Sequence, residues 1–148
     1  MSGLALLATA ALAAGCGGDD EKEALSKSEY VKQGNAICKK FNTVIEKDAE
    51  EAFADIQSRQ DLTAEKARAF FDDALPKFDA VVADIDALAP PEGDEDTVKK
   101  IVEAGESDSA KIEEADDKEV VGFVLSESAT PEFDDQAEAY GLTECGTQ

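Results

Sequence analysis

Three cysteines and a large excess of carboxylates are the side chains through which this sequence could do chemistry. Cys16, Cys38 and Cys145 lie far apart, and no two of them have the CxxC spacing typical of redox catalysis. The sequence contains no His. Without an imidazole, His-based general-base catalysis, serine or cysteine triads and most zinc or haem sites are excluded. We therefore predict no catalytic residue, no metal site and no cofactor, and we expect that the protein is not an enzyme.

The charge balance restricts the partners that the protein can bind. Among 148 residues, 35 are Asp or Glu and 14 are Lys or Arg, which gives a formal net charge of -21. Binding to nucleic acid and electrostatic attachment to an anionic membrane surface both require clustered Lys and Arg, so the composition argues against both. A protein partner of this chain is expected to be cationic.

Clusters of acidic residues are the second candidate for chemistry. Residues 72–73 (DD), 94–96 (DED) and 113–117 (EEADD) offer the oxygen ligands that calcium prefers. No glycine stands in the frame of an EF-hand loop, so two alternatives remain open: a low-affinity divalent-cation binder, or a solvated helix surface. Hydrolysis by a pair of carboxylates would require a cleft, which small helical bundles rarely provide.

The first residues have the pattern of an export signal. Residues 4–14 are apolar, but a helix of eleven residues rises only about 16 Å, roughly half the hydrocarbon core of a bilayer. This length is typical of the apolar region of a signal peptide. Residues 12–16 (LAAGC) resemble the lipobox of bacterial lipoproteins. The resemblance implies cleavage before Cys16 and a diacylglyceryl group, with acyl chains such as palmitate, linked to the Cys16 thiol. The alternatives are an ordinary signal peptide and a buried helix with a chance cysteine.

This pattern divides the chain into three expected segments. Residues 1–15 form a lipoprotein signal peptide, residues 16–25 a lipidated flexible tether, and residues 26–148 a single domain. The protein is then expected on the extracytoplasmic face of the cell membrane, held there by its lipid anchor. Because that space is oxidising, Cys38 and Cys145 are expected either to form a disulfide or to remain two separate buried thiols.

Apolar residues at three- and four-residue steps predict helices through most of the domain. The first helix begins with a capping box at Ser26 and runs to about Ser58. The second begins after Thr63 and ends before the sequence APPEG at residues 89–93. Pro76 lies inside this second helix and is expected either to kink it or to divide it into two shorter helices.

The C-terminal third of the chain has a less regular pattern. A third helix begins at the acidic residues 94–96, and Gly105 with two nearby serines is expected to make it the least stable helix. Residues 120–125 (VVGFVL) fit either a short helix or an extended segment. Thr130 is expected to cap a last helix that ends at Gly141. Together these elements predict an all-α fold, an up-and-down bundle of about four helices.

Several short stretches are similar to a known group of proteins. They are residues 25–31 (LSKSEYV), 34–38 (GNAIC), 88–95 (LAPPEGDE) and 139–146 (AYGLTECG). With the lipobox, they resemble the small, uncharacterised secreted lipoproteins that are common in actinobacteria. The resemblance implies a helical domain clipped by a disulfide between Cys38 and Cys145. No biochemical function is established for that group, so no active site is carried over. The lipobox, the missing catalytic residues and the compact clipped bundle favour a non-catalytic binding or scaffolding role in the cell envelope, toward a cationic envelope protein.

Overall fold

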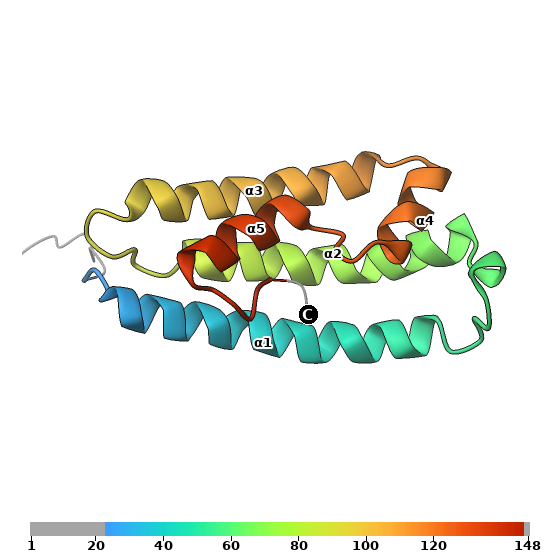
Figure 1. The fold of residues 1–148 in the computed structure, drawn as a ribbon, viewed down its shortest axis with the longest axis horizontal. Helices are drawn as coiled ribbons and strands as arrows, with labels where there is room; N and C mark the ends of the chain where they lie inside the picture. Colours follow the sequence, from blue (N-terminus) through green and yellow to red (C-terminus); the bar gives the residue numbers. More distant parts are fainter. Residues whose placement is uncertain (1–22, 147–148) are drawn as a thin grey trace, which may run out of the picture.

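The computed structural model describes residues 23–146, which form five α-helices and no strand (Figure 1). The all-helical fold class is confirmed, with one helix more than the expected four. Each of the three long helices runs antiparallel to the one before it in the chain, and two short helices follow them (Figure 1). The predicted signal peptide, Cys16 and most of the tether lie outside the described residues. None of the helices within residues 23–146 combines the length and the apolar character needed to span a bilayer.

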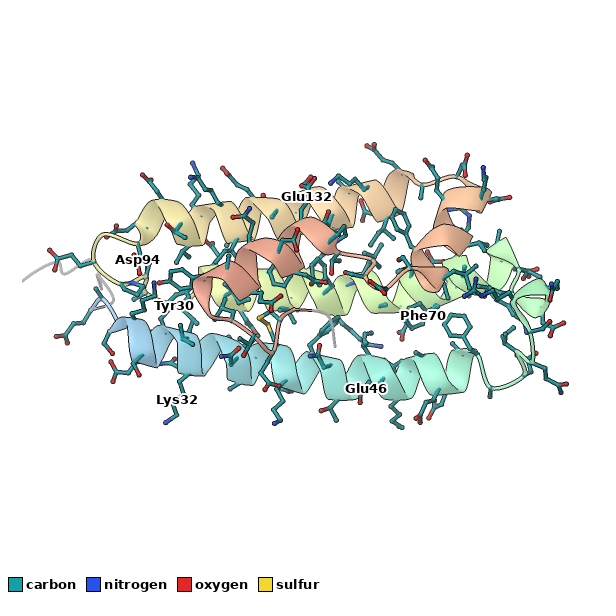
Figure 2. All side chains as sticks on the ribbon, viewed as in Figure 1. Tyr30, Lys32, Glu46, Phe70, Asp94 and Glu132 are labelled. Atoms are coloured by element: carbon teal, nitrogen blue, oxygen red, sulfur yellow. A yellow bond between two sulfur atoms is a disulfide. The ribbon has the colours of Figure 1, made fainter. Side chains whose placement is uncertain are left out.

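Helix α2 is the central element of the fold. The long helices are α1 (Lys27–Ala52), α2 (Ala64–Asp86) and α3 (Glu95–Glu114), and the short ones are α4 (Asp117–Leu125) and α5 (Pro131–Tyr140). The central helix packs against α1, α3 and α4, whereas α5 packs mainly against α3. One core of buried side chains surrounds Tyr30 and Ile85, and a smaller core surrounds Phe71 and Val120. Figure 2 shows Tyr30 pointing into the bundle and Lys32 pointing away from it.

Both ends of α1 follow from local hydrogen bonds. At its start, the Ser26 hydroxyl accepts from the Glu29 backbone N–H, and the Glu29 carboxylate accepts from the Ser26 N–H, as the capping box predicts. At the other end, α1 stops earlier than the expected Ser58. The Asp61 carboxylate accepts hydrogen bonds from the backbone N–H and the hydroxyl of Ser58, which favours a turn and a short 3-10 helix (Arg59–Asp61) over a further helical turn.

Pro76 does not divide α2. The helix is continuous across the proline, so the alternative of two shorter helices is wrong. Proline inside a helix removes one backbone hydrogen bond. The Pro76 side chain is exposed, while Leu75 and Phe78 beside it are buried. Burial of apolar side chains on both sides of the proline therefore holds the two parts of α2 in one helix.

Residues 120–125 belong to helix α4, the element that raises the count to five. The Asp116 carboxylate accepts hydrogen bonds from the backbone N–H groups of Lys118 and Glu119, at 2.8 and 2.9 Å, and so satisfies two donors at the start of the helix. Val120 is buried in the smaller core. Periodicity alone does not distinguish a short helix from an extended segment at residues 120–125. The capping residue Asp116, which precedes this apolar run, favours the helix.

The middle of α3 is a point of close approach between helices. A Cβ atom at Gly105 would lie 2.5 Å from a side-chain carbon of Val82 and 3.1 Å from a ring carbon of Phe133. Ser109 is buried, and its hydroxyl donates a hydrogen bond of 2.7 Å to the Asp79 carboxylate. The residues that lower the helix propensity of α3 thus make its tertiary contacts. Its low stability relative to the other helices stays a prediction.

The segment that follows α5 folds back onto α1. Cys38 and Cys145 form a disulfide with a Cα–Cα distance of 5.0 Å, as the resemblance implies. Two asparagines on the same helix add hydrogen bonds: the Asn35 side-chain oxygen accepts from the Glu144 N–H at 2.9 Å, and the Asn42 amide donates to the Glu144 carbonyl at 2.7 Å. We call this group of Asn35, Cys38 and Asn42 with residues 144–145 the C-terminal clamp.

Candidate binding cavity

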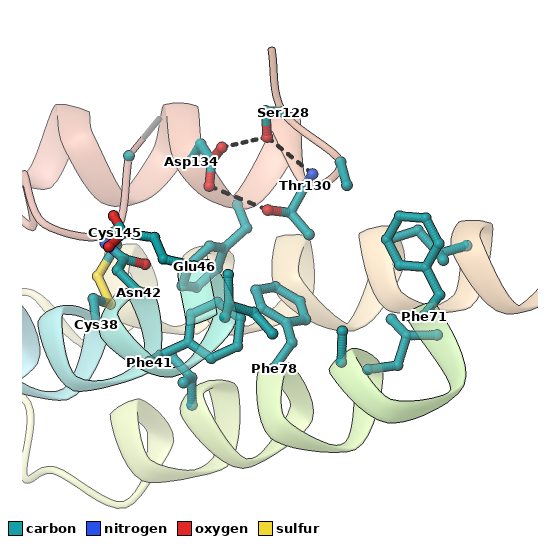
Figure 3. Close-up of a pocket in the computed structure, with 18 of the residues that line it drawn as sticks. Cys38, Phe41, Asn42, Glu46, Phe71, Phe78, Ser128, Thr130, Asp134 and Cys145 are labelled. Carbon is teal, nitrogen blue, oxygen red and sulfur yellow. Dashed lines mark hydrogen bonds between the residues drawn. A yellow bond between two sulfur atoms is a disulfide. The ribbon is translucent and has the colours of Figure 1, made fainter. Parts of the chain in front are cut away.

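An apolar cavity of about 290 Å³ lies between α1, α2 and the connection from α4 to α5 (Figure 3). The main contributors to its apolar walls are Phe41 and Ile45 of α1, Phe71, Ala74 and Phe78 of α2, and Phe133 of α5. Both cysteines of the C-terminal clamp also line the cavity, so the disulfide lies at its boundary. The space is therefore bordered by the elements that fix α1 in place.

The cavity exists because the latter part of α1 packs mainly on one neighbour. The buried residues of this helix are Tyr30, Gly34 and Cys38, and no residue of the helix beyond them is fully buried. Near the end of the helix, the Phe53 ring lies 5.1 Å from the Phe70 ring, which keeps this part of the chain against α2. On its other side α1 faces the cavity.

Three phenylalanine rings give the cavity a stiff aromatic wall. The ring centroids of Phe41 and Phe78 lie 6.0 Å apart, and those of Phe78 and Phe133 lie 5.2 Å apart in an edge-to-face arrangement. Aromatic pairs in these geometries attract each other beyond the burial of their area. Because the rings pack on one another across three helices, they define a preformed apolar surface.

The polar groups that line the cavity include carboxylates and no Lys or Arg. Glu46 comes from α1, Glu127 from the α4–α5 connection and Asp134 from α5. Because Glu46 and Glu127 are exposed, their side chains lie at the mouth. Asp134 is only 7% exposed and lies beside Ser128 and Thr130 of the connection, as Figure 3 shows. The cavity thus combines an apolar interior with an acidic mouth.

Asp134 fixes the connection that covers the cavity. Its carboxylate accepts hydrogen bonds from the hydroxyls of Ser128 and Thr130 (Figure 3). The Ser128 hydroxyl also accepts the backbone N–H of Thr130 at 2.9 Å. Burial raises the pKa of the Asp134 carboxyl, while the two hydroxyl hydrogen bonds oppose that rise. These bonds hold residues 128–130 over the aromatic wall.

Asp108 holds the start of α5, a role that we expected of Thr130. The Asp108 carboxylate accepts hydrogen bonds from the backbone N–H groups of Glu132 and Phe133, at 2.8 and 2.9 Å. Lys111 lies 3.2 Å from its other oxygen. Thr130 is the N-cap residue, as expected, but its side chain makes no capping bond. The capping group comes from a different helix, α3, and the position of Phe133 in the cavity wall depends on it.

The sequence contained one signal for Asp108. Ile101, Gly105, Asp108 and Ile112 follow one another at four-, three- and four-residue steps, which places all of them on the same face of a helix. The structure buries all of them, and Asp108 is 1% exposed. A carboxylate at a core position requires hydrogen-bond donors, because burying an unpaired charge is costly.

The acidic clusters do not converge on a metal site. No group of three His, Cys, Asp or Glu side chains in the described part of the chain is arranged to hold a metal ion. Members of the clusters contact other groups instead. Asp94 accepts a hydrogen bond of 2.7 Å from the Tyr140 hydroxyl and lies 3.6 Å from the Lys27 ammonium, and Asp117 lies 3.0 Å from Arg68.

Comparisons with models of protein families, with curated proteins and with solved structures find no match to this chain. The features that bear on function are therefore those of the chain itself. They are the export pattern of residues 4–16, the disulfide, and the apolar cavity with its acidic mouth.

Proposed function

We propose that this protein is a lipid-anchored, extracytoplasmic protein of the bacterial cell envelope, and that its helical domain binds a small apolar ligand without catalysing a reaction. The apolar run of residues 4–14, followed by the lipobox-like LAAGC, supports the anchor. The Cys38–Cys145 disulfide supports an oxidising compartment, since disulfides rarely persist in the cytosol. A tether of charged and glycine residues then separates the domain from the membrane.

The observation that carries the binding proposal is the cavity itself. Its volume of about 290 Å³ lies close to the lower limit of about 300 Å³ found for small-molecule sites. Helical bundles of this size were not expected to supply such a cleft. A sugar or peptide substrate would leave its polar groups unpaired against the aromatic walls, so the interior favours an apolar ligand. Both oxygens of the Asp134 carboxylate already accept hydrogen bonds, which argues against a role in hydrolysis.

The anchor is tested by the intact mass of the protein extracted from its native membrane, with and without reduction and thiol alkylation. We expect cleavage before Cys16, added acyl mass, and two thiols that react only after reduction. A full-length chain without lipid and with three free thiols would contradict both the anchor and the location.

The binding proposal is tested by titration with N-phenyl-1-naphthylamine, a neutral apolar probe that fluoresces when it leaves water. The full chain with Cys16→Ser prevents lipidation, and the absence of Trp keeps the protein background low. Ala74 lines the cavity and is only 7% exposed. Leu at this position fills the space, so we expect Ala74→Leu to raise the Kd of the probe by about tenfold or more.

Ala83→Leu is the matched control, because Ala83 is an exposed residue of the same helix that does not line the cavity. We expect it to leave the Kd unchanged. Helical content and melting temperature show that both variants fold. Equal affinity of the two variants, or no probe binding by the parent chain, would refute the apolar binding site.

A further inference from the structure

The chemistry of the mouth points to the head group of the ligand. We propose that the cavity binds cationic amphiphiles, molecules with an apolar body and a positively charged nitrogen, and discriminates against anionic ones. The inference rests on the proposed function, because it names the ligand class for the same cavity. The apolar body lies against the aromatic wall, and the charged nitrogen lies at the mouth between Glu46 and Glu127.

The two carboxylates at the mouth are placed for this role. Glu46 and Glu127 come from opposite borders of the cavity, one from α1 and the other from the α4–α5 connection. Within residues 23–146, neither forms an ion pair with a Lys or Arg, although nine such pairs involve other carboxylates. Their charges are thus left uncompensated beside an apolar surface.

A second cavity provides an internal comparison. It lies between α1 and α2, has a volume of about 400 Å³, and shares Phe41 and Val81 with the first cavity. Its charged lining residues are Lys40, Lys77 and Asp84, so both signs of charge are present. The acidic mouth is therefore a property of the first cavity and not of every hollow on this acidic protein.

The apolar walls strengthen the effect of the mouth carboxylates. A low-dielectric wall reduces the screening of a nearby charge, so the field at the mouth attracts a cation and repels an anion more than an open surface does. An anionic head would lose water beside two negative charges, and no Lys or Arg of the cavity lining would compensate for that loss. An ammonium group is attracted by the two carboxylates and also lies close to aromatic rings, which attract cations.

The test uses three competitors with the same eight-carbon chain: octylammonium, octanol and octanoate. Each displaces N-phenyl-1-naphthylamine from the full chain with Cys16→Ser at low ionic strength. We expect octylammonium to displace the probe at a concentration at least about tenfold lower than octanoate, with octanol between them. Equal potency of the three, or stronger displacement by octanoate, would overturn the inference while leaving the apolar site intact.

The double variant Glu46→Gln with Glu127→Gln tests whether the two mouth carboxylates cause the preference for cationic ligands. We expect the ratio between octanoate and octylammonium to fall below about threefold while the potency of octanol stays unchanged. The control is Glu50→Gln with Glu106→Gln, which removes the same charge from two exposed positions outside the cavity. An equal fall in both double variants would assign the selectivity to the net charge of the protein and overturn the role of the mouth. No displacement by octanol in the parent chain would refute the proposed function itself.

Discussion

The parts of α1 before and after Cys38 have similar apolar patterns but different surroundings. The earlier part buries Tyr30 and Gly34 together with Cys38 itself, whereas the later part contains no fully buried residue. Val44, in the later part, is 39% exposed. One part of the helix therefore belongs to the core, and the other forms the wall of a cavity.

This difference shows what an apolar pattern leaves undetermined. Periodicity indicates which face of a helix turns inward, but not whether another element covers that face. Over the earlier part the cover is the C-terminal segment: Leu142 is 0% exposed, and a Cβ atom on Gly34 would lie 2.6 Å from its side chain. Over the later part, the α4–α5 connection leaves space for a ligand.

Removal of the disulfide should have the largest effect on this contrast. Cys38→Ala with Cys145→Ala opens a loop with a sequence separation of 107, for which the chain-entropy model gives roughly 4 to 5 kcal/mol of lost stability. Urea unfolding measures the loss, and hydrogen exchange should show that the earlier part of α1 becomes as poorly protected as the later part. The reduced parent protein is the control. A loss below about 1 kcal/mol would mean that packing alone holds the C-terminal segment.

A pair of isoleucines gives a smaller and more local test. Ile37 packs on the larger core, whereas Ile45 lines the cavity and belongs to neither core. We expect Ile37→Ala to lower the free energy of unfolding by about 1 to 2 kcal/mol, and Ile45→Ala by less than about 0.5 kcal/mol, because Ile37 packs on the larger core whereas Ile45 packs on neither core. Only Ile45→Ala should weaken binding of the naphthylamine probe. Equal losses of stability would remove the contrast between the two parts of the helix.

A small effect at neutral pH is also expected for Tyr30→Phe, which removes a hydrogen bond of 3.2 Å to the Ile85 carbonyl. Burial, aided by the charge of Asp86, raises the pKa of Tyr30 from 10.0 to about 12. The unfolded chain therefore loses this proton at lower pH than the folded protein does. The stability linked to Tyr30 is complete below pH 10 and is lost as the pH rises through 12.

Melting temperatures between pH 9 and 12 measure this dependence. We expect the parent protein to lose stability more steeply than the Tyr30→Phe variant over this range, while lysine ionisation affects both equally. At pH 7 the variant should lose about 1 kcal/mol or less. Parallel curves would show that the hydroxyl of Tyr30 ionises without loss of the fold.

Local signals in the sequence were sufficient for most element boundaries. The capping box at Ser26, the APPEG turn at residues 89–93 and Gly141, whose φ of 110° favours glycine, all mark boundaries that the structure confirms. These features depend on residues within one turn of the boundary. A single sequence is enough to detect them.

The candidate cavity depends on contacts between distant residues and could not be predicted in the same way. Asp108 caps a helix that begins more than twenty residues later, and Asp134 holds a connection whose path depends on where α4 ends. These contacts form only when the helices are packed together. The cavity is the space that the packed elements leave unfilled.

The disulfide also determines what a single proteolytic cut can do to this protein. Cys38 and Cys145 are separated by 107 positions, so most of α1 and all of the other four helices lie inside one covalent loop. A protease that cuts either connection flanking α2, or the one that covers the cavity, produces two fragments that stay joined through the sulfur atoms. With the lipid anchor that we propose at the N-terminus, such a nick would not release the domain from the membrane until the disulfide is reduced.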